Sequence, residues 1–244
     1  MPTMVTTREI ATVAVTVGLI FGAAALAQAY DGGEVKDGGT ISGMVKFAGA
    51  PPARKALDVT KDKEVCGKEK HLGWDLVVGS DKGIQNAVVR LVDVKKGKKW
   101  ASTKAELDQR GCAYKPHVVV MPAGGELKIL NSDGILHNIH TYSKVNPSIN
   151  KAQPKFKKEL IEKFAKPEII KVTCDAHAWM SGWIVVSDHP YIAVTDEKGA
   201  FSLKDVPAGT YKVEIWQETL GKSEKTVTVK AKEETKLSIE LAKK

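Results

Sequence analysis

Residues 169–186, Ile-Ile-Lys-Val-Thr-Cys-Asp-Ala-His-Ala-Trp-Met-Ser-Gly-Trp-Ile-Val-Val, decide the predicted fold. Their two ends, residues 169–173 and 182–186, are rich in β-branched side chains and are predicted to form strands. The loop between them holds Cys174, His177 and Met180. Spacings of three residues let a thiol, an imidazole and a thioether converge from one tight loop. The stretch therefore predicts two β-strands joined by a metal-binding loop.

Copper that transfers one electron prefers two imidazoles and a thiolate in a plane, with a weak axial thioether. The second imidazole must come from outside the loop, because a site held by one loop would flex with it. His137 is the natural candidate, since it follows a predicted strand at 126–130 and the Gly-containing turn 131–134. His140 is the fallback, although on a strand this spacing sends it to the opposite face.

Three alternatives to copper remain open at this point. Cys174-x-x-His177 could be half of a structural zinc site, for which His137 and His140 would have to supply the other half. Cys174 could instead form a disulfide, with Met180 in the core, or the protein could bind no metal. A c-type haem is excluded because the chain has no Cys-x-x-Cys-His motif.

The rest of the chain is predicted to be all-β. Short alternating segments recur between turn residues, which is typical of β-sandwiches. The other predicted strands are residues 40–47, 86–92, 117–121, 126–130, 191–195, 200–203, 211–216, 225–229 and 236–241. Residues 151–168 are ambiguous, because an apolar helical face and an edge strand over 157–164 both fit them.

Residues 114–187 resemble the cupredoxins, the blue copper proteins, and most of all their amicyanin-like members. The resemblance rests on Leu136-His-Asn-Ile-His140 and on Cys174-x-x-His177-x-x-Met180 followed by Gly182. It implies a Greek-key β-sandwich that holds one copper ion through His137, Cys174, His177 and Met180, with His140 not a ligand.

The same resemblance implies roles for residues around the ligands. Asn131 would help to tie the His137 segment to the Cys174 loop. His177 would be the ligand nearest to solvent, and Leu136 and Trp179 would form the apolar patch through which electrons enter or leave.

A second likeness concerns the C-terminal part of the chain. The segment from Val194 to Tyr211, with Pro207 and Gly209, resembles the carboxypeptidase regulatory-like (transthyretin-like) β-sandwich. Such domains often begin with segments like 41–45 and 86–91. This implies a discontinuous sandwich of residues 40–110 and 189–244, with a copper domain at 111–188 inserted between its two parts.

The chain has three cysteines. With Cys174 assigned to the metal, Cys66 and Cys112 remain, and in an oxidising compartment we expect them to form a disulfide.

The N-terminus indicates export. Residues 10–27 carry no charge, and Ala27-Gln-Ala29 fits a signal-peptidase site. We predict a signal peptide at 1–29, a periplasmic or extracellular protein, and no membrane span after cleavage; an uncleaved anchor is the alternative.

The net charge is +8, carried by scattered lysines. Export argues against a nucleic-acid partner, so the basic surface is either simply solvated or steers an acidic redox partner. We expect an electron carrier, not an enzyme, whose partner is a cytochrome or a dehydrogenase. A copper carrier, a structural β-sandwich and a copper-enzyme subunit are the alternatives.

Overall fold

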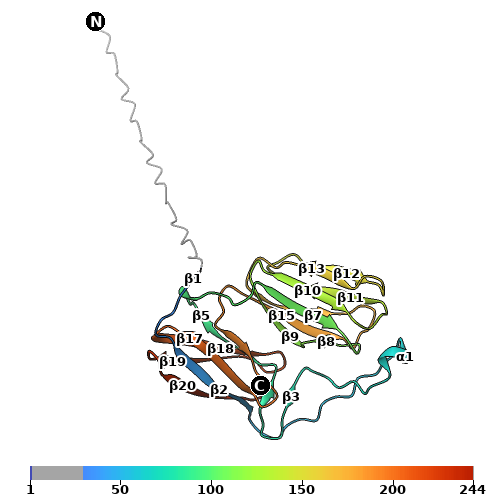
Figure 1. Ribbon diagram of the computed structural model, residues 1–244, viewed down its shortest axis with the longest axis horizontal. Coiled ribbons are helices and arrows are strands. Elements are labelled where there is room, and N and C mark those ends of the chain that lie inside the picture. Colours follow the sequence, from blue (N-terminus) through green and yellow to red (C-terminus); the bar gives the residue numbers. More distant parts are fainter. Residues whose placement is uncertain (2–29, 244) are drawn as a thin grey trace.

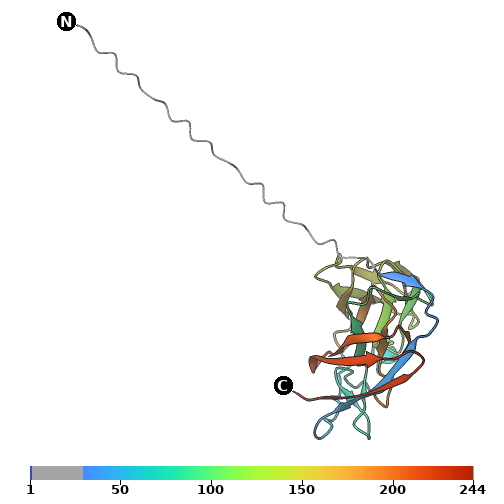
Figure 2. The ribbon, with the colours of Figure 1, turned by 90° about the vertical axis from the view of Figure 1, so that its left-hand side faces the viewer.

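The computed structural model describes Met1 and residues 30–243, so the predicted signal peptide, apart from its first residue, lies outside the described residues. The described chain is all-β, as predicted, and forms two β-units (Figure 1). The blue and red ends of the described chain meet in one of these units (Figures 1 and 2). No helix within the described part is long and apolar enough to cross a membrane.

The first unit is built from both ends of the described chain. One of its sheets has the order β17-β2-β20, and the other has the order β16-β5-β18-β19. The strands are β2 (Gly39–Phe47), β5 (Val88–Val92), β16 (Ile192–Val194), β17 (Ala200–Val206), β18 (Gly209–Gln217), β19 (Gly221–Val229) and β20 (Glu234–Leu241). Two short pairs accompany them: β1 (Asp31–Gly33) with β6 (Lys96–Lys98), and β3 (Val77–Val78) with β4 (Ile84–Gln85).

The second unit carries the residues of the predicted copper site. Its sheets have the orders β13-β10-β7-β8 and β12-β11-β14-β15-β9. The strands are β7 (Lys104–Gln109), β8 (Tyr114–Lys115), β9 (Val118–Pro122), β10 (Glu126–Asn131), β11 (His137–Tyr142), β12 (Asn150–Gln153), β13 (Glu159–Glu162), β14 (Glu168–Thr173) and β15 (Ser181–Ser187). A buried apolar core fills the space between the sheets.

The structure corrects one predicted domain boundary and settles one segment whose sequence was ambiguous. The predicted boundary at residue 110 assigns residues 104–109 to the first unit, but these residues form β7, which pairs in parallel with β10 of the second. The segment KAELDQ has mixed polarity and no β-branched residue, so its sequence gives no strand signal. In the ambiguous stretch 151–168, the edge strand forms and the helix does not, because β13 pairs with β10.

The two units pack against each other through a small apolar layer. Val88 of the first unit and Val118 and Val185 of the second are buried together there. Trp183 and Trp216 meet edge-to-face across this junction, with ring centroids 4.8 Å apart. The second unit is therefore packed against the first and is not joined to it by a linker alone.

A long excursion of the first unit, residues 53–75, crosses to the far end of the second (Figure 1). We call it the strap. It contains the only helix in the described residues, the four-residue α1 (Lys63–Cys66). The predicted disulfide is present, because Cys66 of α1 is bonded to Cys112 of the second unit. The strap is thus attached covalently beside the end of the second unit where β11 begins and β14 ends.

Glu168, at the start of β14, holds the loop that follows β11. Its carboxylate accepts hydrogen bonds from Ser143 Oγ, the backbone N–H groups of Lys144, Val145 and Asn146, and Asn146 Nδ2. Burial alone would raise the pKa of Glu168, but these donors lower it from 4.5 to about 2.

This depressed pKa predicts a pH dependence of stability. Glu168 stabilises the fold fully above pH 4.5, and the contribution is lost as the pH falls towards about 2. We expect Glu168→Gln to lower the free energy of unfolding at pH 7 by about 1–3 kcal/mol. In urea titrations the gap between wild type and variant should close as the pH falls through this window. Glu224→Gln, at an exposed ion pair with Lys212, is the control; a gap of constant size at all pH values would contradict the prediction.

Candidate metal centre

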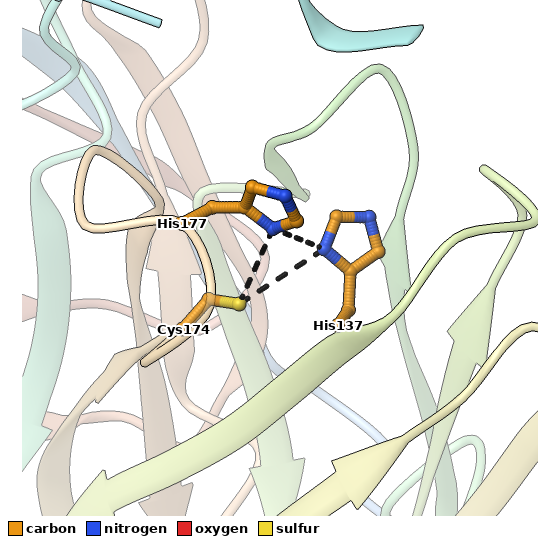
Figure 3. Close-up of side chains that lie close together, drawn as sticks. All are labelled: His137, Cys174 and His177. Carbon is orange, nitrogen blue, oxygen red and sulfur yellow. Dashed lines mark hydrogen bonds between the residues drawn. The ribbon is translucent and has the colours of Figure 1, made fainter. Parts of the chain in front are cut away.

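Three of the four predicted ligands meet at one end of the second unit. His137 is the first residue of β11, and Cys174 directly follows the last residue of β14. These two strands pair in antiparallel fashion, so the start of one and the end of the other lie at the same end of the sheet. His177 comes from the loop that connects β14 to β15. Figure 3 shows the three side chains pointing toward one another.

The donor atoms of these side chains lie close together. The Nδ1 atoms of His137 and His177 are 3.0 Å apart. Cys174 Sγ lies 3.9 Å from Nδ1 of His137 and 3.7 Å from Nδ1 of His177. All three side chains are buried. Together they form a buried cluster of one sulfur and two nitrogens that could hold a metal ion.

The outward nitrogen of each imidazole is held by a carboxylate. His137 Nε2 lies 2.8 Å from Asp133 Oδ2, and His177 Nε2 lies 2.8 Å from Asp62 Oδ2. An ionised carboxylate can only accept, so each Nε2 must carry the proton. When both rings are neutral, the two Nδ1 lone pairs face the sulfur and each other, and either a proton on one Nδ1 or a metal ion between the donors relieves this repulsion. Carboxylates that orient histidine in this way are typical of metal sites.

The separations between the three donor atoms fit a metal ion that binds all of them. With bonds of about 2.0 Å to nitrogen and about 2.3 Å to sulfur at about 120°, the sulfur would lie about 3.7 Å from each nitrogen. The observed 3.7 and 3.9 Å agree with this value. The same geometry separates the two nitrogens by about 3.5 Å, so the rings at 3.0 Å would have to spread by about half an ångström.

The pKa values of His137 and Cys174 also indicate that the cluster favours positive charge beside the sulfur. Burial lowers the pKa of His137, but the hydrogen bond to Asp133 and the Cys174 sulfur outweigh it and raise the pKa to about 9. Burial raises the pKa of the Cys174 thiol, but contacts with His137 and His177 bring it down to about 6. The pocket thus favours a thiolate next to a cation, which is the condition for metal binding by cysteine.

Backbone contacts shape the ligand loop. Met180 N–H donates to the His177 carbonyl at 2.9 Å, and Cys174 N–H donates to the Met180 carbonyl at 3.3 Å, which closes the loop into a tight turn. Gly134, with φ of +70°, lies in the turn that leads into His137. Met180 itself is buried in the same core as Cys174. Its role as the axial ligand stays a prediction.

The link between the two ligand segments comes from a residue other than the one predicted. Asn131, inward-facing on β10 because burial alternates along that strand, donates to the carbonyls of Ile135 and Gln153. It therefore fixes the turn before His137 and not the Cys174 loop. Asn138 makes the expected link, because its side-chain oxygen accepts the Asp175 N–H at 2.9 Å. Asn138 follows His137 directly, so it is better placed than Asn131 to link the His137 segment to the Cys174 loop.

Neither imidazole ligand reaches solvent in this structure, since His137 and His177 are both 0% exposed. His177 is 0% exposed, because Asp62 of the strap lies over its outer nitrogen. Trp179 is half-buried, with its ring 5.0 Å from the His177 ring, whereas Leu136 is 50% exposed. The predicted patch of Leu136 and Trp179 therefore does not surround an exposed His177.

The other histidines lie outside the cluster. His140 is on the outer side of β11 and contacts Asp175, with Nδ1 to Oδ1 at 3.0 Å. His117 is buried, bonded to Glu218 and stacked on Trp74, which agrees with a structural role. A second group of metal-ligating side chains, Cys112 with Asp133 and His137, offers no separate site, since Cys112 is in the disulfide.

Sequence reasoning missed the two carboxylates. Asp133 could have been found, because it lies four residues before His137 in the turn that was already predicted. Asp62 could not, since it is 115 residues from His177 and no local pattern marks it. Asp62 has φ of +45°, a left-handed conformation that aspartate tolerates better than most residues.

Removing the carboxylate behind His137 should weaken metal binding. Asp133→Asn keeps the shape but can donate to Nε2, which favours the wrong tautomer. We expect the affinity for copper to fall about 10–100-fold. Asp175→Asn, which changes the same group behind the non-ligand His140, should leave the affinity within about threefold. Competition titrations with a copper chelator measure both, and equal losses in the two variants would contradict the assignment.

Comparison with solved structures gives distant relatives. One is described as a novel purple cupredoxin from Nitrosopumilus maritimus: it is 21% identical, and the match covers 34% of this chain and 99% of that chain, with a TM-score of 0.30. A point mutant of amicyanin in its Cu(I) form is 17% identical, with 36% of this chain and 87% of that chain covered and a TM-score of 0.32.

A third similar structure is the Cu-containing nitrite reductase from Thermus scotoductus SA-01, at 21% identity, with 41% of this chain and 25% of that chain covered and a TM-score of 0.30. Residues 162–237 match the family described as polysaccharide lyase family 4, domain II. No curated protein sequence matches this chain. These likenesses are too distant to assign a function, so the metal centre rests on its own geometry.

Proposed function

We propose that this protein is an exported type 1 copper protein that carries single electrons between redox partners. The observation that supports this most is the convergence of Cys174 Sγ and the two Nδ1 atoms on one buried point, with both Nε2 atoms engaged by carboxylates. This is the donor set of blue copper sites. Copper would supply one-electron chemistry through its Cu(I) and Cu(II) states.

The protein's own residues would hold the site rigid. Cys174 would provide the thiolate, His137 and His177 would provide the two imidazole nitrogens, and the Met180 thioether would tune the potential. His137 is held by a strand, Cys174 by the end of the paired strand, and His177 by the closed loop. These side chains would then have little room to move between the two redox states, and their burial would exclude water from the site.

The burial of the donor set favours electron transfer over the other candidate functions. A copper enzyme would need an open coordination position for its substrate, and a storage protein would bind through exposed Met and His clusters. We therefore propose a carrier rather than an enzyme, located in the periplasm or outside the cell, with a cytochrome or a dehydrogenase as partner. For the first unit, whose predicted family is the regulatory-like sandwich, we propose a structural role.

One optical experiment tests the proposal. The purified protein with one equivalent of Cu(II) should develop a strong visible thiolate-to-copper absorption that disappears on reduction and returns on oxidation. Cys174→Ser should abolish the band. A colourless Cu(II) complex, or a Cys174→Ser variant of unchanged colour, would contradict the proposal. Tight binding of Zn(II) in preference to copper would favour the structural zinc alternative.

A further inference from the structure

We infer that an acidic redox protein docks on the surface formed by Leu136, Lys155, Phe156, Lys157 and Lys158, which we call the tip. This inference rests on the proposed function, because it names the partner class and the place where electrons pass to or from the His137 side of the centre. It shares Leu136 with the predicted patch around His177, but replaces Trp179 with Phe156 and the three lysines.

The first step is that the His177 side is covered. Asp62 lies 2.8 Å from His177 Nε2 on the side that faces away from the donor cluster, and the disulfide between Cys66 and Cys112 holds the strap in place. Since His177 and His137 are both 0% exposed, a partner cannot touch either imidazole, and electrons must pass through residues beside them.

The second step is the distribution of exposed apolar side chains. Apart from Met1, five large hydrophobic residues are exposed in the described chain, and two of them, Phe156 and Leu136, belong to the tip. Phe156 is the most exposed of them, at 80%, and Leu136 is 50% exposed. An aromatic side chain held out in water at this level is a typical anchor of a protein interface.

The third step is the position of the tip beside the metal centre. Leu136 is bonded covalently to the ligand His137. The turn that carries Phe156 joins β12 to β13, and Gln153 of β12 pairs with His137 itself. Asn131 binds both sides: its side chain donates to the Ile135 and Gln153 carbonyls, and its N–H donates to the Lys158 carbonyl. The two segments of the tip therefore flank the same buried asparagine.

The fourth step is charge. Lys155, Lys157 and Lys158 are exposed, and none of them forms an ion pair with any residue that the structure describes. Neighbouring lysines differ, since Lys128, Lys151 and Lys163 each pair with a glutamate. Three uncompensated positive charges around an exposed phenylalanine fit a partner with an acidic rim and an apolar centre.

In the complex, one electron would leave the reduced partner, which becomes oxidised, and would reduce copper(II) to copper(I).

A plant-type [2Fe–2S] ferredoxin, an acidic one-electron protein, can serve as the test partner. Stopped-flow mixing gives its rate of reduction of the Cu(II) protein as a function of ionic strength. We expect Lys155→Glu/Lys157→Glu/Lys158→Glu to lower this rate at least about tenfold at low salt. The matched control, Lys204→Glu/Lys225→Glu/Lys236→Glu, makes the same charge change at exposed lysines of the first unit and should stay within about twofold.

Binding without electron transfer gives a second readout. The metal-free wild type should bind oxidised ferredoxin more tightly than the tip variant does, and Phe156→Ser should weaken binding without a change in charge. Equal rates and affinities for the tip and control variants, with the visible copper band intact, would overturn the docking surface alone. Absence of that band in the wild type would instead overturn the proposed function. If the tip variants bind ferredoxin as well as the wild type does but lose binding to anionic phosphatidylglycerol vesicles, the tip binds a lipid surface. That result would overturn the proposal that its partner is an acidic protein.

Discussion

Removing the disulfide with Cys66→Ala/Cys112→Ala should lower the free energy of unfolding by about 4 kcal/mol. The bond joins residues 46 positions apart, and the loss of a link of that length releases chain entropy in the unfolded state. The strap also loses its covalent attachment next to Asp62, so the native state should open locally over His177. Urea denaturation of the metal-free protein measures the first effect, and hydrogen exchange of the strap amides measures the second.

The control for this variant is Lys63→Ala/Lys70→Ala, which changes two exposed strap residues and keeps the disulfide. It should stay within about 0.5 kcal/mol of the wild type. Reducing the wild type with a dithiol should reproduce the double variant. Unchanged stability and unchanged strap protection after loss of the disulfide would show that packing alone holds the strap, contrary to our expectation.

Replacing His137 with asparagine should abolish the metal centre. The shorter amide side chain would keep a donor toward Asp133 but offers no imidazole nitrogen to the cluster. We expect the affinity for copper to fall by more than about 100-fold, beyond the loss for an outer carboxylate, and the visible band to vanish. Optical titration with Cu(II) measures both quantities.

His140→Asn is the matched control, since it makes the same change three residues away. His140 contacts Asp175 on the outside of the sheet, so its loss should leave the band and the affinity unchanged. The reverse result, with colour lost in His140→Asn and kept in His137→Asn, would mean that the metal binds on the outer face of β11.

Much of the site could be predicted because its chemistry is local in sequence. Cys174 and His177 share one short loop, and the two flanking strands have a clear β-branched pattern. The disulfide followed from there being only three cysteines. The face on which His140 lies followed from the period of two along a strand.

The parts that could not be predicted depend on long-range contacts. The strap is a polar segment with no strong periodicity, and only the fold places its Asp62 over His177. The strand β7 has no strand signal of its own and forms because β10 offers it an open edge in the second unit. Burial of His177 follows from the strap contact, so the sequence alone did not show that both imidazoles are buried.

X-ray absorption at the copper edge tests the central claim most directly. For the oxidised protein with one copper per chain, we predict two imidazole nitrogens and one short sulfur in the first shell, and loss of the sulfur in Cys174→Ser. A first shell of only nitrogen and oxygen in the wild type would show that copper does not bind at the cluster of His137, Cys174 and His177, and would contradict the account.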